Sequence, residues 1–180
     1  YGEDVINYAT INKHAAVVVA CGNNYAEALN YPAGYRRAIS TGALQALGQK
    51  TPNSAWHYTL DIMTPGAGGF TSLAAPVVTS GVALAYKRFH YDLANAAYTG
   101  YQAGQRVRVT ANYAVVYGNN PATMQDKMGL GRLDMYNAVK DSLKLPSMRI
   151  NADTFNITVG DADSDIESGE TVTVNLGYIN

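Results

Sequence analysis

The sequence predicts an α/β fold in which helices flank a mostly parallel β-sheet. A short, unbroken, β-branched run covers residues 15–21, which is typical of a strand buried on both faces of a parallel sheet. A helical pattern over residues 2–14 leads directly into that run, as in the second half of a βαβ unit. Apolar strand-like and helical segments then alternate as far as residue 142. Together these observations favour a parallel sheet over an antiparallel one.

The remaining elements of this part follow from local patterns. Two further strands are expected, a buried one at 37–44 and one of mixed polarity at 56–63, and a flexible glycine turn follows at 66–69. Helices are expected at 71–87, around 92–111 and at 133–142, with a loop around 118–121.

The pattern changes at Pro146. Residues 148–159 and 170–180 alternate with the two-residue period of exposed strands, and they predict the opening hairpin of a β-sandwich. Two strands alone are not stable, so we expect the sequence to be a piece of a longer polypeptide. The expected division is a domain part at 1–145 and the start of a second domain at 146–180.

Composition excludes several classes of protein. The formal net charge of −1 over 180 residues leaves no basic footprint for nucleic acid. No apolar run reaches the roughly 20 residues that a bilayer span requires, and the first residues do not resemble a signal peptide. Cys21 is the only cysteine, so neither an intrachain disulfide nor a cysteine-based zinc site can form.

Ser72 stands at the start of the helix expected over 71–87. A serine there is ordinarily an N-cap. Here glycines precede it, small residues follow it, and Pro76 is expected in the first turn, where its missing N–H costs least. Small neighbours leave the hydroxyl accessible, and a helix N-terminus offers a backbone N–H and a positive dipole end to an anion. These are the needs of an acyl-transfer nucleophile.

Asn23 follows the strand expected at 15–21. In doubly wound sheets, ligands bind beyond the carboxyl ends of the strands. The asparagine there is either a turn former, since Asn tolerates the left-handed region, or a donor aimed at an oxyanion. From this residue alone the turn is the simpler interpretation.

Four blocks in order resemble the subtilisin-like serine proteases, the subtilases. They are residues 6–23 (INYATINKHAAVVVACGN), 30–44 (NYPAGYRRAISTGAL), 60–76 (LDIMTPGAGGFTSLAAP) and 127–139 (KMGLGRLDMYNAV). Chance agreement across four ordered blocks is improbable. The resemblance covers about residues 1–142, and it implies the C-terminal half of a subtilisin-like catalytic domain.

The resemblance implies specific roles. Ser72 would be the nucleophile, and Asn23 would donate its side-chain amide to the oxyanion together with the backbone N–H of Ser72. The bond between Tyr31 and Pro32 matches a position where the family tends to have a cis peptide. Ala20, Cys21, Gly22 and Asn30 fall where the family forms the walls of the pocket for the residue before the scissile bond.

Two features depart from the family pattern. Phe70 stands where the nucleophile motif normally has glycine, and a bulky ring there could crowd the cleft. The blocks that carry the catalytic aspartate and histidine lie upstream in the family and are not in this sequence. We expect His14, His57 and His90 to be capping, surface or packing residues. A serine without a base is a weak nucleophile, so this chain alone should not turn over peptides.

The acidic turn after residue 160 allows two interpretations. Asp161, Asp163 and Asp165 alternate, and alternating carboxylates can converge on calcium. Ile166 occupies the position where an EF-hand loop requires glycine, so a solvated acidic turn is the simpler interpretation. No cofactor is required by the expected chemistry, and a structural calcium is the one ion that the sequence suggests.

The function that these observations predict is serine endopeptidase activity of the parent protein, secreted or at the cell surface, on polypeptide substrates. The missing N-terminal half of the catalytic domain would be an obligatory partner, and without it we expect the chain to be unstable. The rival interpretation is an inactive subtilase-like binding or assembly module. A different hydrolytic or nucleotide-binding α/β domain is disfavoured, because GxSxG, GxGxxG and P-loop motifs are absent.

Overall fold

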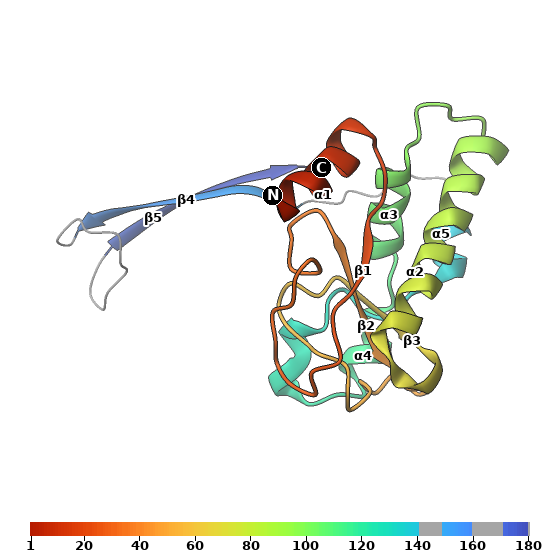
Figure 1. Cartoon of the computed structure of the whole chain (residues 1–180), viewed down its shortest axis with the longest axis horizontal. Helices are drawn as coiled ribbons and strands as arrows, with labels where there is room; N and C mark the ends of the chain where they lie inside the picture. The colour runs from red at the N-terminus through yellow and green to blue at the C-terminus, as the bar shows by residue number, and fades with distance from the viewer. Residues whose placement is uncertain (141–148, 160–170, 180) are drawn as a thin grey trace. The chain divides into compact units, whose positions relative to one another are not determined.

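The computed structural model describes residues 1–140, 149–159 and 171–179. They form two compact units, Tyr1–Leu145 and Pro146–Asn180, each considered by itself. The first unit contains a parallel three-stranded sheet in the order β1-β2-β3, made of Val18–Ala20, Ile39–Leu44 and Ile62–Pro65 (Figure 1). The predicted α/β fold with a parallel sheet flanked by helices is therefore confirmed.

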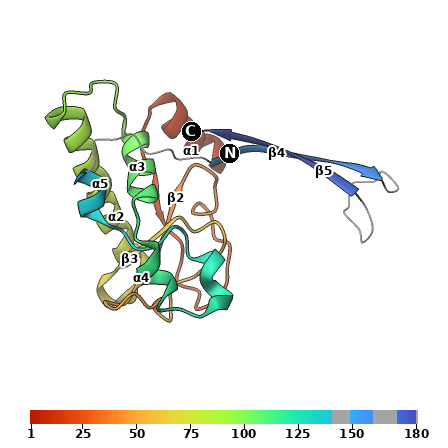
Figure 2. The ribbon, with the colours of Figure 1, turned by 180° about the vertical axis from the view of Figure 1, so that it is seen from behind.

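Helices α2, α3 and α5 pack against one another and cover one face of this sheet (Figures 1 and 2). The helices of the unit are α1 (Gly2–Asn7), α2 (Thr71–Tyr86), α3 (Gly100–Val109), α4 (Tyr113–Tyr117) and α5 (Met135–Lys140). Single π-helical turns follow α1 and α2 at Tyr8–Asn12 and Lys87–Asp92, and 3-10 turns cover Ala67–Gly69 and Ala122–Lys127. No helix in the described part of the chain is long and apolar enough to cross a membrane.

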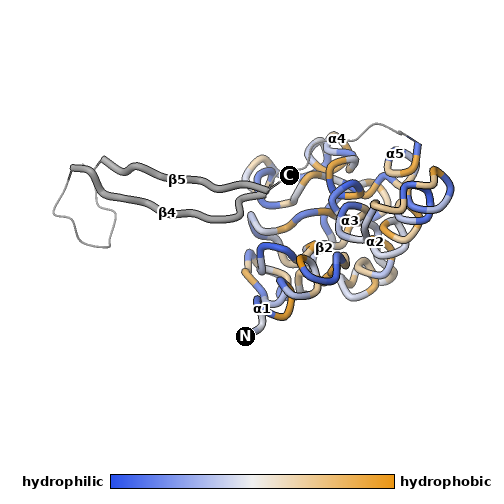
Figure 3. The backbone as a smooth tube through the Cα atoms, turned by 90° about the horizontal axis from the view of Figure 1, so that it is seen from above, coloured by the Kyte–Doolittle hydropathy of each residue, from blue (hydrophilic) through white to orange (hydrophobic). Residues whose placement is uncertain are grey.

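Two hydrophobic clusters lie on the two faces of the sheet. Ile62 belongs to the cluster under α2 and α3, whereas its neighbour Met63 belongs to the other, because successive strand residues point to opposite faces. On the helical side the tube alternates between hydrophobic and hydrophilic positions along α2 and α3 (Figure 3). Both faces of β2 are thus covered, and all six of its residues are buried.

The prediction of a strand at 56–63 is wrong for residues 56–61, because β3 begins at Ile62. Trp56 makes only an isolated bridge to Glu27, and a turn follows in which Leu60 N–H donates to the His57 carbonyl at 2.9 Å. The ladder with β2 begins only at Ile62. The apolar and aromatic residues before it were mistaken for strand because they pack on the second cluster from a loop.

The ends of other elements also differ from expectation. The helix expected around 92–111 begins at Gly100, where Thr99 and Gln102 form a capping box. Residues 113–117 form a helix that was not expected, capped by Asn112. β1 is half-buried rather than fully buried, because it is an edge of the described sheet.

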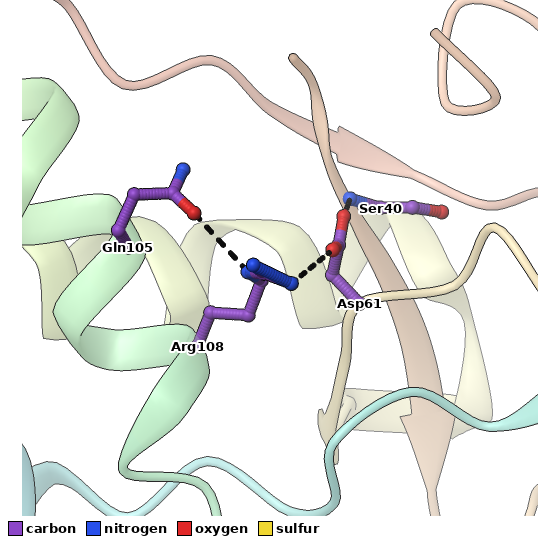
Figure 4. A network of polar contacts seen from close by, with 4 residues as sticks. All are labelled: Ser40, Asp61, Gln105 and Arg108. Carbon is purple, nitrogen blue, oxygen red and sulfur yellow. Dashed lines mark hydrogen bonds and ion pairs between the residues drawn. The ribbon is translucent and has the colours of Figure 1, made fainter. Parts of the chain in front are cut away.

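A polar network fixes the entry of β3 against β2. Asp61, immediately before β3, accepts the backbone N–H of Ser40 at 2.9 Å and lies 3.5 Å from the Arg108 guanidinium of α3 (Figure 4). Arg108 also donates from Nε to Gln105 Oε1 at 3.2 Å. The backbone N–H of Asp61 also donates to the Ser40 carbonyl at 3.0 Å, so backbone and carboxylate together join Asp61 to Ser40, and the carboxylate attaches α3 to the sheet.

The second unit is an antiparallel pair of strands, β4 (Arg149–Val159) and β5 (Thr171–Ile179). Its ladder shifts register between Ile150 and Ala152 and between Ile157 and Val159. The expected hairpin strands are therefore present, while the β-sandwich stays a prediction. The candidate calcium ligands Asp161, Asp163 and Asp165 lie outside the described residues.

Candidate active site

Ser72 is the second residue of α2 and is exposed to solvent. The chain reaches it through the turn Gly66–Gly69, in which Gly68 and Gly69 take the left-handed φ values of 63° and 76°. Those two conformations favour glycine, since a Cβ would be strained there. The turn therefore allows β3 to pass into α2 within a few residues and leaves the start of the helix open.

The backbone conformation at position 70 does not require glycine in this structure. Its φ of −90° and ψ of 138° are extended backbone that any residue adopts, and its carbonyl accepts from the N–H groups of Leu73 and Ala74. The Phe70 ring lies over Gly68, since a Cβ built on Gly68 would be 3.3 Å from ring atom Cδ2. The ring thus covers the turn.

The expectation for Pro76 needs correction. It was expected in the first turn, but α2 begins at Thr71 and Pro76 is its sixth residue. Proline there has no N–H to donate to the carbonyl of Ser72, four residues earlier. The small residues at 74 and 75 are instead buried or half-buried against the sheet.

Asn23 is brought beside the start of α2 and oriented there. Its Oδ1 accepts two hydrogen bonds from Thr71, one from the backbone N–H and one from the hydroxyl, both at 3.1 Å. The carbonyl end of the amide is therefore occupied, which assigns Nδ2 to the free end. Asn23 is exposed, whereas Thr71, which orients the asparagine through these two bonds, is fully buried.

Two hydrogen-bond donors remain unpaired at this point. Within residues 1–140, neither the backbone N–H of Ser72 nor Nδ2 of Asn23 has a hydrogen-bond partner. Both belong to groups next to the exposed Ser72 hydroxyl, at the positive end of a 16-residue helix. An oxygen that gains negative charge beside Ser72 would find donors from two separate chain segments, which is the requirement of an oxyanion hole.

The four predicted pocket residues lie near the end of β1, and each has different contacts. Asn30 donates from Nδ2 to the Cys21 carbonyl at 2.7 Å and to Asn24 Oδ1 at 2.8 Å. Gly22 has a φ of 106°, and a Cβ on it would come within 2.5 Å of Asn30 Nδ2. Ala20 is half-buried at the end of β1. The peptide bond between Tyr31 and Pro32 is cis, at the position that the resemblance indicated.

The Cys21 side chain points away from this surface. Its thiol lies 3.3 Å from the Ala55 carbonyl and 3.7 Å from Ser54 Oγ, within the second hydrophobic cluster. Burial raises the pKa of the Cys21 thiol from 9.0 to about 11. Only its backbone can therefore line a pocket, and the thiol is an inert core group at neutral pH.

No base for Ser72 is present in the described part of the chain. His57 contacts Thr59 within a turn, and His90 lies 2.9 Å from the Tyr98 carbonyl and stacks on Tyr86. His14 is exposed with a φ of 54°, after the π-helical turn that ends at Asn12. The surface and packing roles expected for His57 and His90 agree with these contacts, although His57 lies in a turn and not in a strand. The described part of the chain also contains no group of three or more histidine, cysteine, aspartate or glutamate side chains that could hold a metal ion.

Thr71 is the residue of the candidate site that the sequence analysis did not identify. The sequence shows that Thr71 directly precedes Ser72. It does not show that the backbone N–H and the hydroxyl of Thr71 donate to an asparagine 48 positions earlier in the chain. The only available signal was a small polar residue next to the proposed nucleophile.

The fold and the site define an α/β domain of the kind that serine proteases use. The chain belongs to the subtilase family, whose model matches residues 2–131. The family membership that the sequence resemblance indicated is therefore confirmed.

Individual relatives agree with this membership. The thermostable alkaline protease of Halalkalibacterium halodurans is 29% identical over an alignment of 124 residues, and the match covers 60% of this chain and 33% of that protein. Among solved structures, the prenylagaramide maturation protease PagA matches with a TM-score of 0.66 at 19% identity, over 77% of this chain and 54% of that one. The epidermin leader peptide processing protease of Staphylococcus aureus matches with a TM-score of 0.60 at 19% identity, over 81% and 45%.

At such low identity the structural matches show a shared fold. The chain spans about a third of the length of the curated relative it matches, and about half of the solved chains.

Proposed function

We propose that this chain supplies the nucleophile and the oxyanion hole of a serine endopeptidase whose histidine and aspartate come from a segment upstream. The observation that carries the proposal is the pair of unpaired donors beside Ser72, one of which is oriented by Thr71. A serine that served as a helix cap would stand at the N-cap, but that position is Phe70 and Ser72 is the second residue of the helix.

In the proposed reaction, Ser72 Oγ attacks the carbonyl carbon of a peptide bond while its proton passes to the upstream histidine. The carbonyl oxygen becomes an oxyanion that accepts from Asn23 Nδ2 and from the Ser72 N–H. The carbon–nitrogen bond then breaks, the leaving amine takes the proton from the histidine, and an ester on Ser72 remains. Water, deprotonated by the same histidine, hydrolyses this ester and restores the hydroxyl.

An unpartnered surface of the first unit supports the need for the upstream half. Val5, Tyr8 and Ile11 are 54%, 55% and 48% exposed and follow one another at helical spacing. β1 is an edge strand with no second neighbour in the part of the chain that the structure describes. We propose that the upstream half of the catalytic domain packs on this apolar face, which would otherwise remain in water.

The remaining parts of the proposal follow from the same chemistry. The reaction requires no cofactor, and a structural calcium at Asp161, Asp163 and Asp165 stays a proposal. A polypeptide is the proposed substrate, with Ala20, Gly22 and Asn30 next to the residue before the scissile bond. We also propose that the protein acts outside the cell or at its surface, which detection of the protein in the culture medium would test.

The test is covalent labelling by a fluorophosphonate, which reacts with a serine only when a base activates it. The chain is expressed together with its upstream segment, and the labelled peptide is identified by mass spectrometry. We expect one label, on Ser72, and none in the Ser72→Ala variant. The matched control is Ser80→Ala, which removes a hydroxyl from the same helix that bonds only the Pro76 carbonyl and should leave labelling unchanged.

Absence of label on a folded protein that contains both halves would contradict the proposal. It would favour the rival function, a subtilase-like module that binds a polypeptide without cleaving it. Label on any other serine would show that the site has been assigned to the wrong residue.

A further inference from the structure

The ammonium group of Lys50 lies among three backbone carbonyls of the segment that follows it. Its Nζ atom donates to the carbonyl oxygens of Thr51 at 2.6 Å, Ser54 at 3.0 Å and Pro52 at 3.2 Å. The same nitrogen lies 4.5 Å from the centroid of the Trp56 ring. An ammonium has three N–H donors, so the three carbonyls satisfy all of them, and the ring adds a cation–π contact.

This set of acceptors favours a cation over a neutral donor. Within residues 1–140, the carbonyls of Pro52 and Ser54 accept no hydrogen bond from the protein other than the one from Lys50, and no carboxylate forms an ion pair with Lys50. Carbonyl dipoles that point at one position repel one another unless a positive charge lies between them. Burial lowers the pKa of the Lys50 ammonium, which agrees with its partial withdrawal from water.

The segment 51–55 (TPNSA) touches the nucleophile side of the candidate active site. The Thr51 hydroxyl donates to the carbonyl of Gly69, three residues before Ser72, at 2.9 Å. Thr51 is buried, and a Cβ on Gly69 would lie 3.1 Å from its Cγ2 atom, so the two residues pack closely. The position of the turn that leads into Ser72 therefore depends on Thr51.

The same segment also touches the asparagine side, where two backbone hydrogen bonds hold the residues around Asn23. The N–H of Ala55 donates to the Gly22 carbonyl at 2.9 Å, and the N–H of Tyr25 donates to the Asn53 carbonyl at 3.2 Å. Both Ala55 and Asn53 are buried. The segment therefore joins the loop that carries the asparagine to the turn that precedes the nucleophile.

We propose that Lys50 is a positioning residue, whose ammonium is a tethered cation that fixes the carbonyls of segment 51–55 and thereby holds Asn23 and Ser72 in place relative to each other. This inference rests on the proposed endopeptidase function. Without the charge, the three carbonyls would move apart, and the two oxyanion donors would no longer converge on one oxygen. A small cation supplied in solution would restore the arrangement if the side chain were removed.

The first test changes the charge and keeps a long side chain, in the chain expressed with its upstream segment. Lys50→Met is neutral, whereas Lys50→Arg keeps the positive charge. We expect kcat for peptide hydrolysis to fall by roughly tenfold or more in Lys50→Met with KM unchanged, because the contacts to the oxyanion form only in the transition state. Lys50→Arg should retain most of kcat.

The matched control is Lys140→Met. Lys140 also lies over an aromatic ring, at 5.0 Å from the Tyr136 centroid, but it is exposed and belongs to α5. Its substitution should leave kcat unchanged. All rates are measured well below the thermal midpoint of each variant, so that loss of folded protein does not contribute to them.

A second test examines the cation site without relying on activity. Lys50→Ala leaves three carbonyls and the Trp56 ring around a space that suits a methylammonium ion. Added methylammonium should raise both the thermal midpoint and kcat of Lys50→Ala in a saturable manner, and it should change neither in wild type, whose site is filled. Tetramethylammonium, which has no N–H to donate, should have no such effect.

The outcomes separate this inference from the proposed function. If wild type neither hydrolyses the peptide nor takes the phosphonate label on Ser72, the proposed function fails, and the thermal response of Lys50→Ala to methylammonium still tests the cation site. If wild type is active and Lys50→Met keeps its kcat, or Lys50→Arg loses as much as Lys50→Met, the positioning role is overturned. If Lys50→Met does not fold, recovery of Lys50→Ala in methylammonium supports the inference, and no recovery overturns it.

Discussion

Replacing Thr71 by valine tests whether the orientation of Asn23 matters for turnover. The substitution keeps the shape of a side chain that is fully buried and removes the hydroxyl that donates to Asn23 Oδ1. The backbone N–H of Thr71 still donates to the same oxygen at 3.1 Å. The asparagine should therefore remain near its place with one of its two restraints.

The size of the effect follows from the bond that is lost. A hydrogen bond between neutral groups contributes about 0.5–1.5 kcal/mol, and each 1.36 kcal/mol of barrier is about tenfold in rate. We expect kcat to fall by roughly 2–12-fold in Thr71→Val. Removing the donor itself, in Asn23→Ala, should cost about 10²–10³; that range is the value known for the corresponding asparagine of subtilisin and is not worked out from this structure.

The assay is steady-state hydrolysis of one peptide by the chain expressed with its upstream segment, in a double-mutant cycle. Thr71→Val should slow wild type but have no further effect in the Asn23→Ala background, because Thr71 acts through Asn23. Thr71→Ser keeps the hydroxyl and is the matched control. Equal slowing by Thr71→Val in both backgrounds would refute the reasoning and assign Thr71 a purely structural role.

Three further predictions concern stability. Because burial raises the pKa of Cys21 from 9.0 to about 11, the folded state keeps a proton that the unfolded state loses; stability should fall by about 2–3 kcal/mol as pH rises through this interval. The free energy of unfolding, measured by denaturant titration at a series of pH values, should depend on pH differently in wild type and Cys21→Ser only between about pH 9 and 11. The same pH dependence in both proteins would contradict the burial of the thiol. Asp61→Asn should lower the free energy of unfolding by about 1–3 kcal/mol, since it weakens the bonds to Ser40 and Arg108, and an unchanged urea midpoint would count against that network. Gly22→Ala should lower the thermal midpoint, because its φ of 106° and the nearby Asn30 amide leave no room for a Cβ; a midpoint equal to wild type would argue against this local geometry.

The parts of the fold that the sequence predicted well are those where one local pattern dominates. The apolar run after Thr71 has helical spacing, and α2 ends at Tyr86, one residue before the expected end. β2 lies within the buried strand expected at 37–44, and all six of its residues are buried, as in a strand covered on both faces. At Trp56 the apolar pattern had a different cause, since a loop residue packs on the core while its backbone bonds elsewhere.

The sequence indicated individual residues of the candidate site, but it did not indicate how they are arranged. Ser72 and Asn23 were identified from a family resemblance, which assigns roles by position in a motif. That resemblance could not tell whether Phe70 would block the site, because the answer depends on where its ring turns. The ring lies over Gly68, which only the three-dimensional arrangement shows.

The position of Thr71 explains how an exposed asparagine can serve as a well-oriented donor. An exposed amide normally rotates and exchanges its bonds with water, so it would have to be ordered each time an oxyanion forms. Two donors from a buried residue on the first turn of α2 hold Oδ1 before any substrate arrives. The same turn of helix also carries Ser72, so one helix positions the proposed nucleophile, the proposed backbone donor and the amide of Asn23. In the proposed mechanism, such a site needs only a base from elsewhere, because the groups that would stabilise the oxyanion are already fixed relative to one another.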